Sequence, residues 1–106
     1  MIKKIILLIV LLTSIFSFSQ EKFTLSGTIS DLNTKETLIG VNIFILETKT
    51  GITTNEYGFY SITLPKGEYT ISISYVGYQV IEEKISLNSN IKKNILISKY
   101  LIKNEI

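Results

Sequence analysis

The sequence predicts an all-β protein, a seven-stranded antiparallel sandwich, on the basis of three observations. Beyond the first twenty residues, apolar and polar side chains alternate with a period of two along most segments. Gly, Asn and Pro, which favour turns, separate these segments at short intervals. No segment of this region has the apolar spacing of an amphipathic helix. Together the three patterns indicate two antiparallel sheets packed face to face.

The first twenty residues have the pattern of an export signal. A pair of lysines precedes an unbroken apolar run over residues 5–12, and the small residues Ser17 and Ser19 stand just before Gln20. We therefore expect residues 1–19 to be a signal peptide that is cleaved before Gln20. The alternative is a membrane anchor, since apolar residues recur after the run. Against it, two polar residues interrupt the apolar stretch, and a spanning helix needs about 20 apolar residues.

The charge balance and the missing residue types argue against several function classes. The chain has 11 Lys and Arg against 9 Asp and Glu, and two lysines lie in the predicted signal peptide, so residues 20–106 balance nine against nine. Without net positive charge, the electrostatic footprint of a nucleic-acid-binding protein is missing. The chain also has no His and no Cys, which removes the commonest zinc ligands and the usual nucleophile and base pairs. We therefore expect no enzymatic activity, no metal site and no cofactor.

The first two strands are predicted directly after this leader. Over residues 23–30, apolar residues such as Leu25 and Ile29 fall on one face and hydroxyl-bearing residues on the other, which predicts a half-buried strand. Residues 31–38 are mainly polar and predict a loop. Residues 41–46 are apolar on both faces, so we expect a central strand that is buried on both sides.

Two turns flank the next predicted strand, residues 59–64. Asn55 can accept hydrogen bonds from the following backbone amides in an Asx-turn, and Gly58 can then adopt positive φ. Pro65 presets φ at the first position of the second turn, and Gly67 is free to adopt positive φ at its third. We therefore expect both glycines in the left-handed region.

The clearest alternation of the chain lies in residues 69–75 and predicts the strand that carries the core. Its inward face is expected to hold Tyr69, Ile71, Ile73 and Tyr75. Tyr69 is also a candidate for a tyrosine corner, in which the hydroxyl bonds a nearby backbone carbonyl. Gly77 then predicts a bulge or a tight bend. Further strands are expected over residues 78–87 and 91–98.

Several motifs, taken in their order along the chain, resemble a known family. They are Leu25-Ser-Gly27-Thr-Ile29-Ser-Asp31, Leu38-Ile-Gly40-Val41-Asn-Ile43, Gly51-Ile-Thr53-Thr54-Asn55-Glu-Tyr-Gly58-Phe59-Tyr60, Leu64-Pro65-Lys-Gly67-Glu-Tyr69 and Ser74-Tyr75-Val76-Gly77-Tyr78. Over roughly residues 23–98 the chain is similar to the carboxypeptidase regulatory-like domain. One departure is Asn55, where the family usually has Asp; the Asx-turn is kept and a carboxylate is lost.

The resemblance implies a fold, a cellular location and a function. The fold is a transthyretin-like or prealbumin-like sandwich, Ig-like in its general arrangement, over residues 20–98, with a tail or linker over residues 99–106. Such domains commonly follow the signal peptide at the periplasmic N-terminus of TonB-dependent outer-membrane receptors, which import glycans and other nutrients. The chain is accordingly expected to be exported and to act as a non-catalytic accessory or interaction domain, periplasmic or outer-membrane associated. Its partner would be a protein there or the remainder of a receptor chain.

Alternatives to that reading stay open. The chain is expected to be either a fragment of a longer receptor or a free-standing copy of the receptor's N-terminal domain. The alternative function is a secreted binding or adhesion module, with a glycan as its ligand. An enzyme ranks last, because the carboxylates are scattered and no His or Cys partners a Ser or Thr.

Tyrosines are the candidate partner-binding residues. Exposed tyrosine is enriched at interfaces, and the candidates are Tyr57, Tyr75 and Tyr78. Tyr78 directly follows Gly77, and of the three it is expected to be the most exposed.

The polar loop after the first strand offers one alternative site. Asp31, Asn33 and Glu36 carry oxygen ligands that suit calcium. Loops of this composition more often bond their own backbone amides, and we expect that role here.

Overall fold

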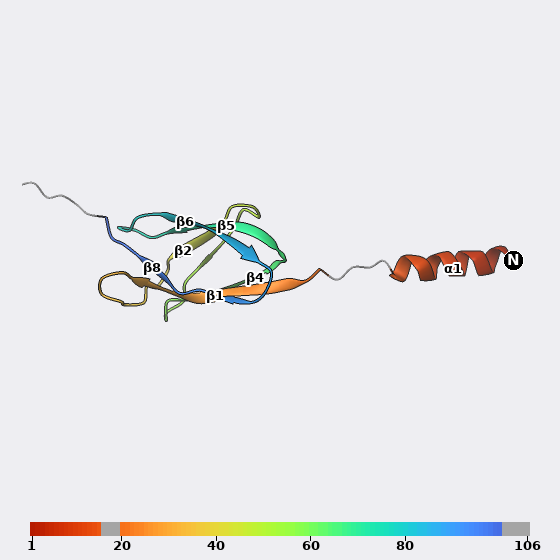
Figure 1. The fold of residues 1–106 in the computed structure, drawn as a ribbon, viewed down its shortest axis with the longest axis horizontal. Coiled ribbons are helices and arrows are strands. Elements are labelled where there is room, and N and C mark those ends of the chain that lie inside the picture. The colour runs from red at the N-terminus through yellow and green to blue at the C-terminus, as the bar shows by residue number, and fades with distance from the viewer. Residues whose placement is uncertain (16–19, 101–106) are drawn as a thin grey trace, which may run out of the picture.

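The structure, a computed structural model, describes residues 1–15 and 20–100. Residues 20–100 form a two-layer β-sandwich, and helix α1 (Ile2–Ile15) lies apart from it (Figure 1). The strands are β1 (Lys22–Asp31), β2 (Asn42–Ile45), β3 (Thr50–Thr53), β4 (Phe59–Pro65), β5 (Gly67–Ser74), β6 (Ile81–Leu87), β7 (Ile91–Lys92) and β8 (Ile95–Ile97). The predicted all-β sandwich is therefore confirmed.

The first sheet is built around β1. Its strand order is β4-β1-β7, and β8 pairs with β1 beyond β7. The pairing of β1 with β4 is antiparallel, from Lys22 opposite Pro65 to Thr28 opposite Phe59, whereas β7 and β8 are parallel to β1. The predicted last strand, residues 91–98, is thus divided in two and is not antiparallel to its neighbour. The reason is that the chain crosses over from β6 in the other sheet and returns in the same direction as β1.

The second sheet has the order β3-β2-β5-β6 and is antiparallel throughout. As predicted, β2 is a central strand, but the expected burial of both its faces is wrong. Ile43 and Ile45 are fully buried, while Phe44 is 37% exposed. In a sandwich of two layers each sheet covers only the inner face of the other, so the outer face of a central strand stays in contact with solvent.

The core lies between the two sheets. Its buried apolar residues are Leu25, Ile29, Val41, Ile43, Ile45, Tyr60, Leu64, Ile71, Ile73, Tyr78, Ile85, Leu87, Ile95 and Ile97. The predicted inward face of β5 is confirmed, because Ile71 and Ile73 are fully buried and Tyr69 and Tyr75 pack against the core. The predicted tyrosine corner is also present: the Tyr69 hydroxyl donates to the Pro65 carbonyl at 2.6 Å.

One of the two glycine predictions is confirmed and the other is wrong. Asn55 Oδ1 accepts hydrogen bonds from the N–H groups of Tyr57 and Phe59, and Gly58 has φ +72°. Gly67 is not among the described glycines with positive φ, and it begins β5. The physical reason is that β4 and β5 belong to different sheets, so their connection is a crossing between layers rather than a hairpin turn.

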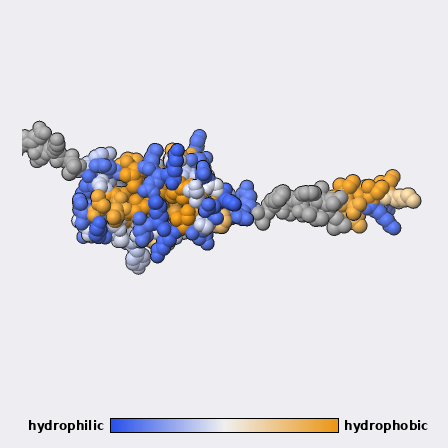
Figure 2. Space-filling view, in the orientation of Figure 1, coloured by the Kyte–Doolittle hydropathy of each residue, from blue (hydrophilic) through white to orange (hydrophobic). Residues whose placement is uncertain are grey.

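The leader has a helix, and its cleavage lies beyond what the structure describes. In Figure 2 the described part of α1 is mainly apolar, whereas the visible surface of the sandwich mixes polar and apolar residues. Residues 16–19, where cleavage is predicted, are outside the described residues. Within residues 1–15 and 20–100, no helix combines the length and apolar character needed to cross a membrane. The signal peptide over residues 1–19 stays a prediction.

The C-terminal segment stays attached to the sandwich further than expected. Ser98 accepts a backbone hydrogen bond from Gln79 at 2.8 Å, and the Tyr100 N–H donates to the Gly77 carbonyl at 3.0 Å. Lys99 forms an antiparallel bridge with Tyr78 between these bonds. The tail predicted over residues 99–106 therefore begins inside a paired segment, and the sandwich extends at least to residue 100.

Candidate functional site

Three connections meet at one end of the sandwich. They are residues 32–41 between β1 and β2, residues 54–58 between β3 and β4, and residues 75–80 between β5 and β6. The Gly40 N–H donates to the Thr54 carbonyl at 3.0 Å, which joins the first two connections. Gly40 also lines a hollow of about 390 Å³ together with Tyr75 and Val76, which brings in the third.

Exposed apolar side chains gather at this end. They are Leu32, Ile39, Tyr57, Phe59, Val76, Val80 and Tyr100. The sandwich's other exposed large apolar residues, Phe44, Leu46 and Leu96, lie on or beside the strands. We call these seven residues, which lie in the three connections, at the start of β4 or in the C-terminal segment paired with Gly77, the apolar loop end. Apolar residues clustered on an exposed surface are typical of a contact site for another macromolecule.

Tyr57 has the exposure that the sequence prediction requires. Its side chain is 71% exposed at the tip of the β3–β4 connection. The Tyr57 N–H donates to Asn55 Oδ1 at 2.9 Å, so the Asx-turn fixes the backbone from which the ring projects. An exposed ring on a fixed backbone loses little conformational entropy on binding, which suits it to contact a partner.

Tyr75 presents only part of its ring. It is half-buried against the core, with its ring centroid 5.5 Å from that of Tyr78. The next residue, Val76, is 94% exposed. The two residues form one wall of the hollow, whose remaining lining residues are Gly40, Asn42 and Ser74. Tyr75 and Val76 together therefore offer an apolar surface next to polar backbone and side-chain groups.

The expectation that Tyr78 is exposed is wrong. Its side chain is 7% exposed, and its hydroxyl donates to Asp31 Oδ2 at 2.6 Å. Gly77, with φ +84°, turns the chain back, so that Tyr78 enters the core between the sheets. The hydrogen bond to the carboxylate raises the pKa of Tyr78 to about 12. Tyr78 thus positions the loop that carries Tyr75 and Val76 and does not itself reach the surface.

The loop after β1 bonds its own backbone, as predicted. Asp31 Oδ1 accepts hydrogen bonds from the N–H groups of Asn33 at 2.8 Å and Thr34 at 2.9 Å. The bond from Tyr78, followed by that from Thr34, lowers the pKa of Asp31 to about 2. Both oxygens of this carboxylate are therefore occupied. Among the described residues, no group of three His, Cys, Asp or Glu side chains could hold a metal ion.

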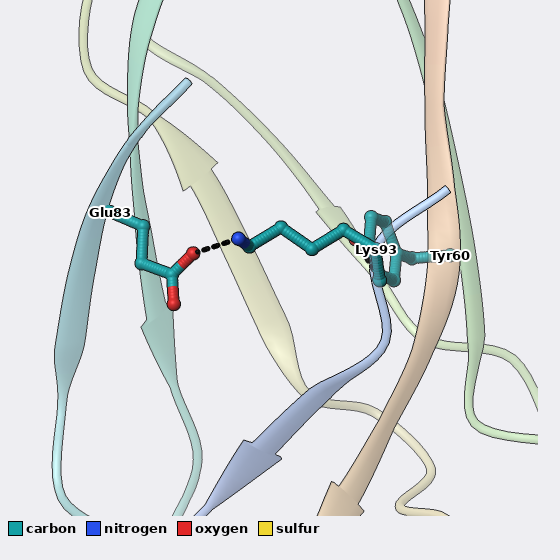
Figure 3. Close-up of polar contacts among 3 residues, drawn as sticks. All are labelled: Tyr60, Glu83 and Lys93. Carbon is teal, nitrogen blue, oxygen red and sulfur yellow. Dashed lines mark hydrogen bonds and ion pairs between the residues drawn. The ribbon is translucent and has the colours of Figure 1, made fainter. Parts of the chain in front are cut away.

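Lys93 forms a polar contact between the sheets that the sequence reasoning missed (Figure 3). Its carbonyl accepts a 2.6 Å hydrogen bond from the buried Tyr60 hydroxyl, and its Nζ lies 3.0 Å from Glu83 Oε2. Burial, and then the charge of Glu83, raise the pKa of Tyr60 to about 12. The sequence of β6 contained a signal for this contact. Glu83 alternates in step with the inward residues Ile81 and Ile85, so its side chain is expected on the face that meets the other sheet.

A second hollow lies towards the opposite end, and most of the residues that line it are polar or charged. It has a volume of about 470 Å³ and is lined by Glu47, Glu68, Tyr69, Thr70, Lys84, Ile85 and Ser86. Glu47 Oε1 accepts a 2.7 Å hydrogen bond from the Thr70 N–H, and this bond lowers the pKa of Glu47. The carboxylate thereby continues the hydrogen bonding of the sheet where β2 ends, which is a structural role.

Known proteins match this chain both in sequence and in fold. The chain is 30% identical over 90 residues to the TonB-dependent receptor P3 of Formosa agariphila, an alignment that covers 85% of this chain and 9% of the receptor. The chain therefore spans less than a tenth of that receptor's length.

Solved structures share the sandwich at low sequence identity. A type II cohesin–X-dockerin complex from Acetivibrio cellulolyticus contains a chain with a TM-score of 0.61 and 20% identity, covering 71% of this chain and 56% of that one. The C-terminal domain of the shaft pilin SpaA from Lactobacillus rhamnosus GG has a TM-score of 0.57 and 13% identity, covering 76% of this chain and 100% of that one. At these identities the likeness concerns the fold alone.

The sequence match also extends to a family. The model of the CarboxypepD_reg-like domain matches residues 25–105, which is most of the sandwich and agrees with the resemblance found in the spaced motifs. The chain belongs to the CarboxypepD_reg-like domain family.

Proposed function

We propose that this chain is an exported, non-catalytic accessory domain of a TonB-dependent uptake system at the outer membrane, and that it acts through contact with a protein. The observation that carries the proposal is the apolar loop end, where Tyr57 and Val76 are strongly exposed on fixed turns. The last described residue, Tyr100, lies on the same surface. The partner is therefore either a separate envelope protein or the remainder of a receptor chain that contains this domain.

The family and the receptor relative support this assignment. The chain belongs to the CarboxypepD_reg-like domain family. A relative that contains a similar segment is a TonB-dependent receptor. The balanced charge of residues 20–106 favours contact through apolar surface over electrostatic capture. The same features fit a receptor fragment and a free-standing copy equally well.

Site-specific photocrosslinking in the cells that produce the chain tests the proposal. A photoreactive phenylalanine analogue replaces Val76 in one variant and Asn88 in a control variant, because Asn88 is exposed in the turn after β6, at the opposite end. We expect a discrete adduct at position 76 with a component of a TonB-dependent receptor, identified by mass spectrometry, and none at position 88. No adduct at position 76, or the same adducts at both positions, would contradict the proposal.

The absence of a metal requirement is part of the same proposal. The two oxygens of Asp31 already accept hydrogen bonds from Asn33, Thr34 and Tyr78, so a calcium ion would compete with these donors for the carboxylate. We expect calorimetric titration with calcium to show no binding, and the adduct at position 76 to form in the presence of a chelator. A tight calcium isotherm with a chelator-sensitive adduct would favour a metal site at Asp31, Asn33 and Glu36.

A glycan-binding module is the second candidate function, and one observation favours it. Tyr57 is 71% exposed and Phe59, two residues later, is also exposed, and aromatic rings can stack on sugar rings. If this candidate holds, the chain binds oligosaccharides in calorimetry, and Tyr57→Ala abolishes the heat of binding. Binding that is unchanged in Tyr57→Ala would exclude this site.

A further inference from the structure

The first and last strands of the sandwich lie side by side and run in the same direction. Leu25 pairs with Ile91 in the parallel contact of β1 with β7, and Ile29 to Asp31 pair with Ile95 to Ile97 in that of β1 with β8. At the far end the Leu32 N–H donates to the Ile97 carbonyl at 2.9 Å. The segment by which the chain enters the sandwich is thus bonded along its length to the segment by which it leaves.

Asparagine side chains complete this contact where backbone pairing is missing. The Thr24 N–H donates to Asn90 Oδ1 at 2.9 Å, before β7 begins. The Thr28 N–H donates to Asn94 Oδ1 at 3.0 Å, in the gap between β7 and β8. Hydrogen bonds therefore continue without a break from Thr24 to Leu32 on the side of β1.

Lys93 lies in the same gap and makes three polar contacts there. Its N–H donates to the Ser26 carbonyl at 2.7 Å, its carbonyl accepts the Tyr60 hydroxyl, and its Nζ pairs with Glu83. Gly27 permits this approach, because a Cβ at that position would overlap the Lys93 carbonyl oxygen. The gap between β7 and β8 is therefore tied to both sheets.

The geometry determines how the sandwich responds to tension. β1 begins at the end of the sandwich nearest α1, and β8 ends at the opposite end (Figure 1). Tension between the two ends pulls β1 and β8 in opposite directions along their own axes. The hydrogen bonds between them are then loaded in shear, so they must break together. By contrast, β1 and β4 are antiparallel, and pulling Glu21 away from Lys66 would open that pair one bond at a time.

From this arrangement we infer a further property: the sandwich resists tension applied between the start of β1 and the end of β8, and the contact of β1 with β7 and β8 is its shear clamp. The clamp consists of the parallel backbone pairing together with the Asn90, Asn94 and Lys93 contacts. Force applied through the two ends of the sandwich reaches the clamp before the core. This inference does not depend on the identity of the partner at the apolar loop end.

Single-molecule pulling of the full chain tests the clamp. The chain contains no cysteine, so introduced cysteines are unique sites for attaching handles. One variant carries Gln20→Cys and Tyr100→Cys, which loads β1 and β8 in shear; the other carries Gln20→Cys and Lys66→Cys, which unzips β1 from β4. All three side chains are exposed. We expect a clearly higher rupture force in the first geometry. Equal rupture forces in the two geometries would overturn the inference.

Asn94→Ala probes the clamp itself, with Asn88→Ala as the matched control. Loss of the Thr28 bond should raise the unfolding rate at constant force about fivefold in the shear geometry, which corresponds to one hydrogen bond. In the unzipping geometry the rate should stay unchanged.

The described structure gives no side-chain hydrogen bond for Asn88, and its substitution should change neither rate. The inference fails if Asn94→Ala leaves the shear rate unchanged or raises both rates equally. Asn90→Ala, which removes the Thr24 bond, provides an independent second variant.

Discussion

The Tyr60 hydroxyl donates a 2.6 Å hydrogen bond to the Lys93 carbonyl, across the strand that separates them. Gly27, directly opposite Tyr60 in β1, makes the contact possible because it has no side chain where the carbonyl lies. The carbonyl stands at the gap between β7 and β8, where it has no strand partner. A tyrosine from one side of β1 therefore satisfies a backbone group on the other side.

Tyr60→Phe should destabilise the protein by about 1–3 kcal/mol, because the ring stays buried while the Lys93 carbonyl loses its hydrogen bond. Urea unfolding followed by circular dichroism measures the change. Tyr57→Phe removes a hydroxyl from an exposed ring and should stay within about 0.5 kcal/mol of the parent. Equal stability of Tyr60→Phe and the parent would show that water can replace the hydroxyl.

Gly58→Ala should cost more stability than Gly67→Ala. Gly58 has φ +72°, and an added Cβ would lie 2.6 Å from the Thr37 Cβ, so we expect a loss of at least about 1–3 kcal/mol. At Gly67 the nearest atoms to an added Cβ lie 3.6 Å away, on the Tyr69 ring, which is an ordinary contact. Thermal melts of the two variants compare them directly. If both melt at the same temperature, the backbone conformation assigned to residue 58 is wrong.

Ile73→Ala should destabilise the sandwich by about 2–5 kcal/mol, since Ile73 is fully buried at the centre of the core. For a domain of this size that is a large share of the total stability. Denaturant unfolding provides the measurement. A loss below about 1 kcal/mol would contradict the burial of this face of β5.

Stability should fall in acid through protonation of Asp31. Its pKa is lowered from 3.8 to about 2, so the folded state favours the ionised carboxylate. The stabilisation is complete above pH 3.8 and is lost as the pH falls towards 2. Asp31→Asn removes the carboxylate, and Tyr78→Phe removes the main cause of the pKa shift. Both variants should be less stable than the parent at neutral pH, and their free energy of unfolding should change less between pH 3.8 and 2. If the free energy of unfolding of both variants falls with pH as steeply as that of the parent, other groups cause the loss of stability in acid.

The exported protein should begin at Gln20. The small residues Ser17 and Ser19 have the spacing of a signal peptidase site, and α1 precedes them as a separate helix. Intact-mass measurement of protein from the cell envelope gives the new N-terminus. Material that still begins at Met1 would favour the membrane anchor.

Local patterns in the sequence predicted most of the strands, though not β3, because side-chain parity depends only on the local backbone. The alternation of residues 69–75 placed Ile71 and Ile73 inside, and Asn55 with Gly58 defined a turn within four residues. Both signals act over a few neighbouring residues, so no knowledge of the remaining chain is needed. The same local reasoning failed at Gly67, because the sheet to which each flanking strand belongs is not a local property.

Alternation and spaced motifs in the sequence were enough to predict the β-sandwich, its core strand and its family. The roles of Tyr78 and Lys93, by contrast, depend on contacts between distant parts of the chain. Tyr78 is buried because its partner is Asp31, 47 positions earlier in the chain, and Lys93 bonds Tyr60, 33 positions away. The parallel return of β7 and β8 beside β1 likewise follows from the crossing between sheets. Contacts between residues so far apart form only when both sheets close on one core, and no periodicity along the chain records them.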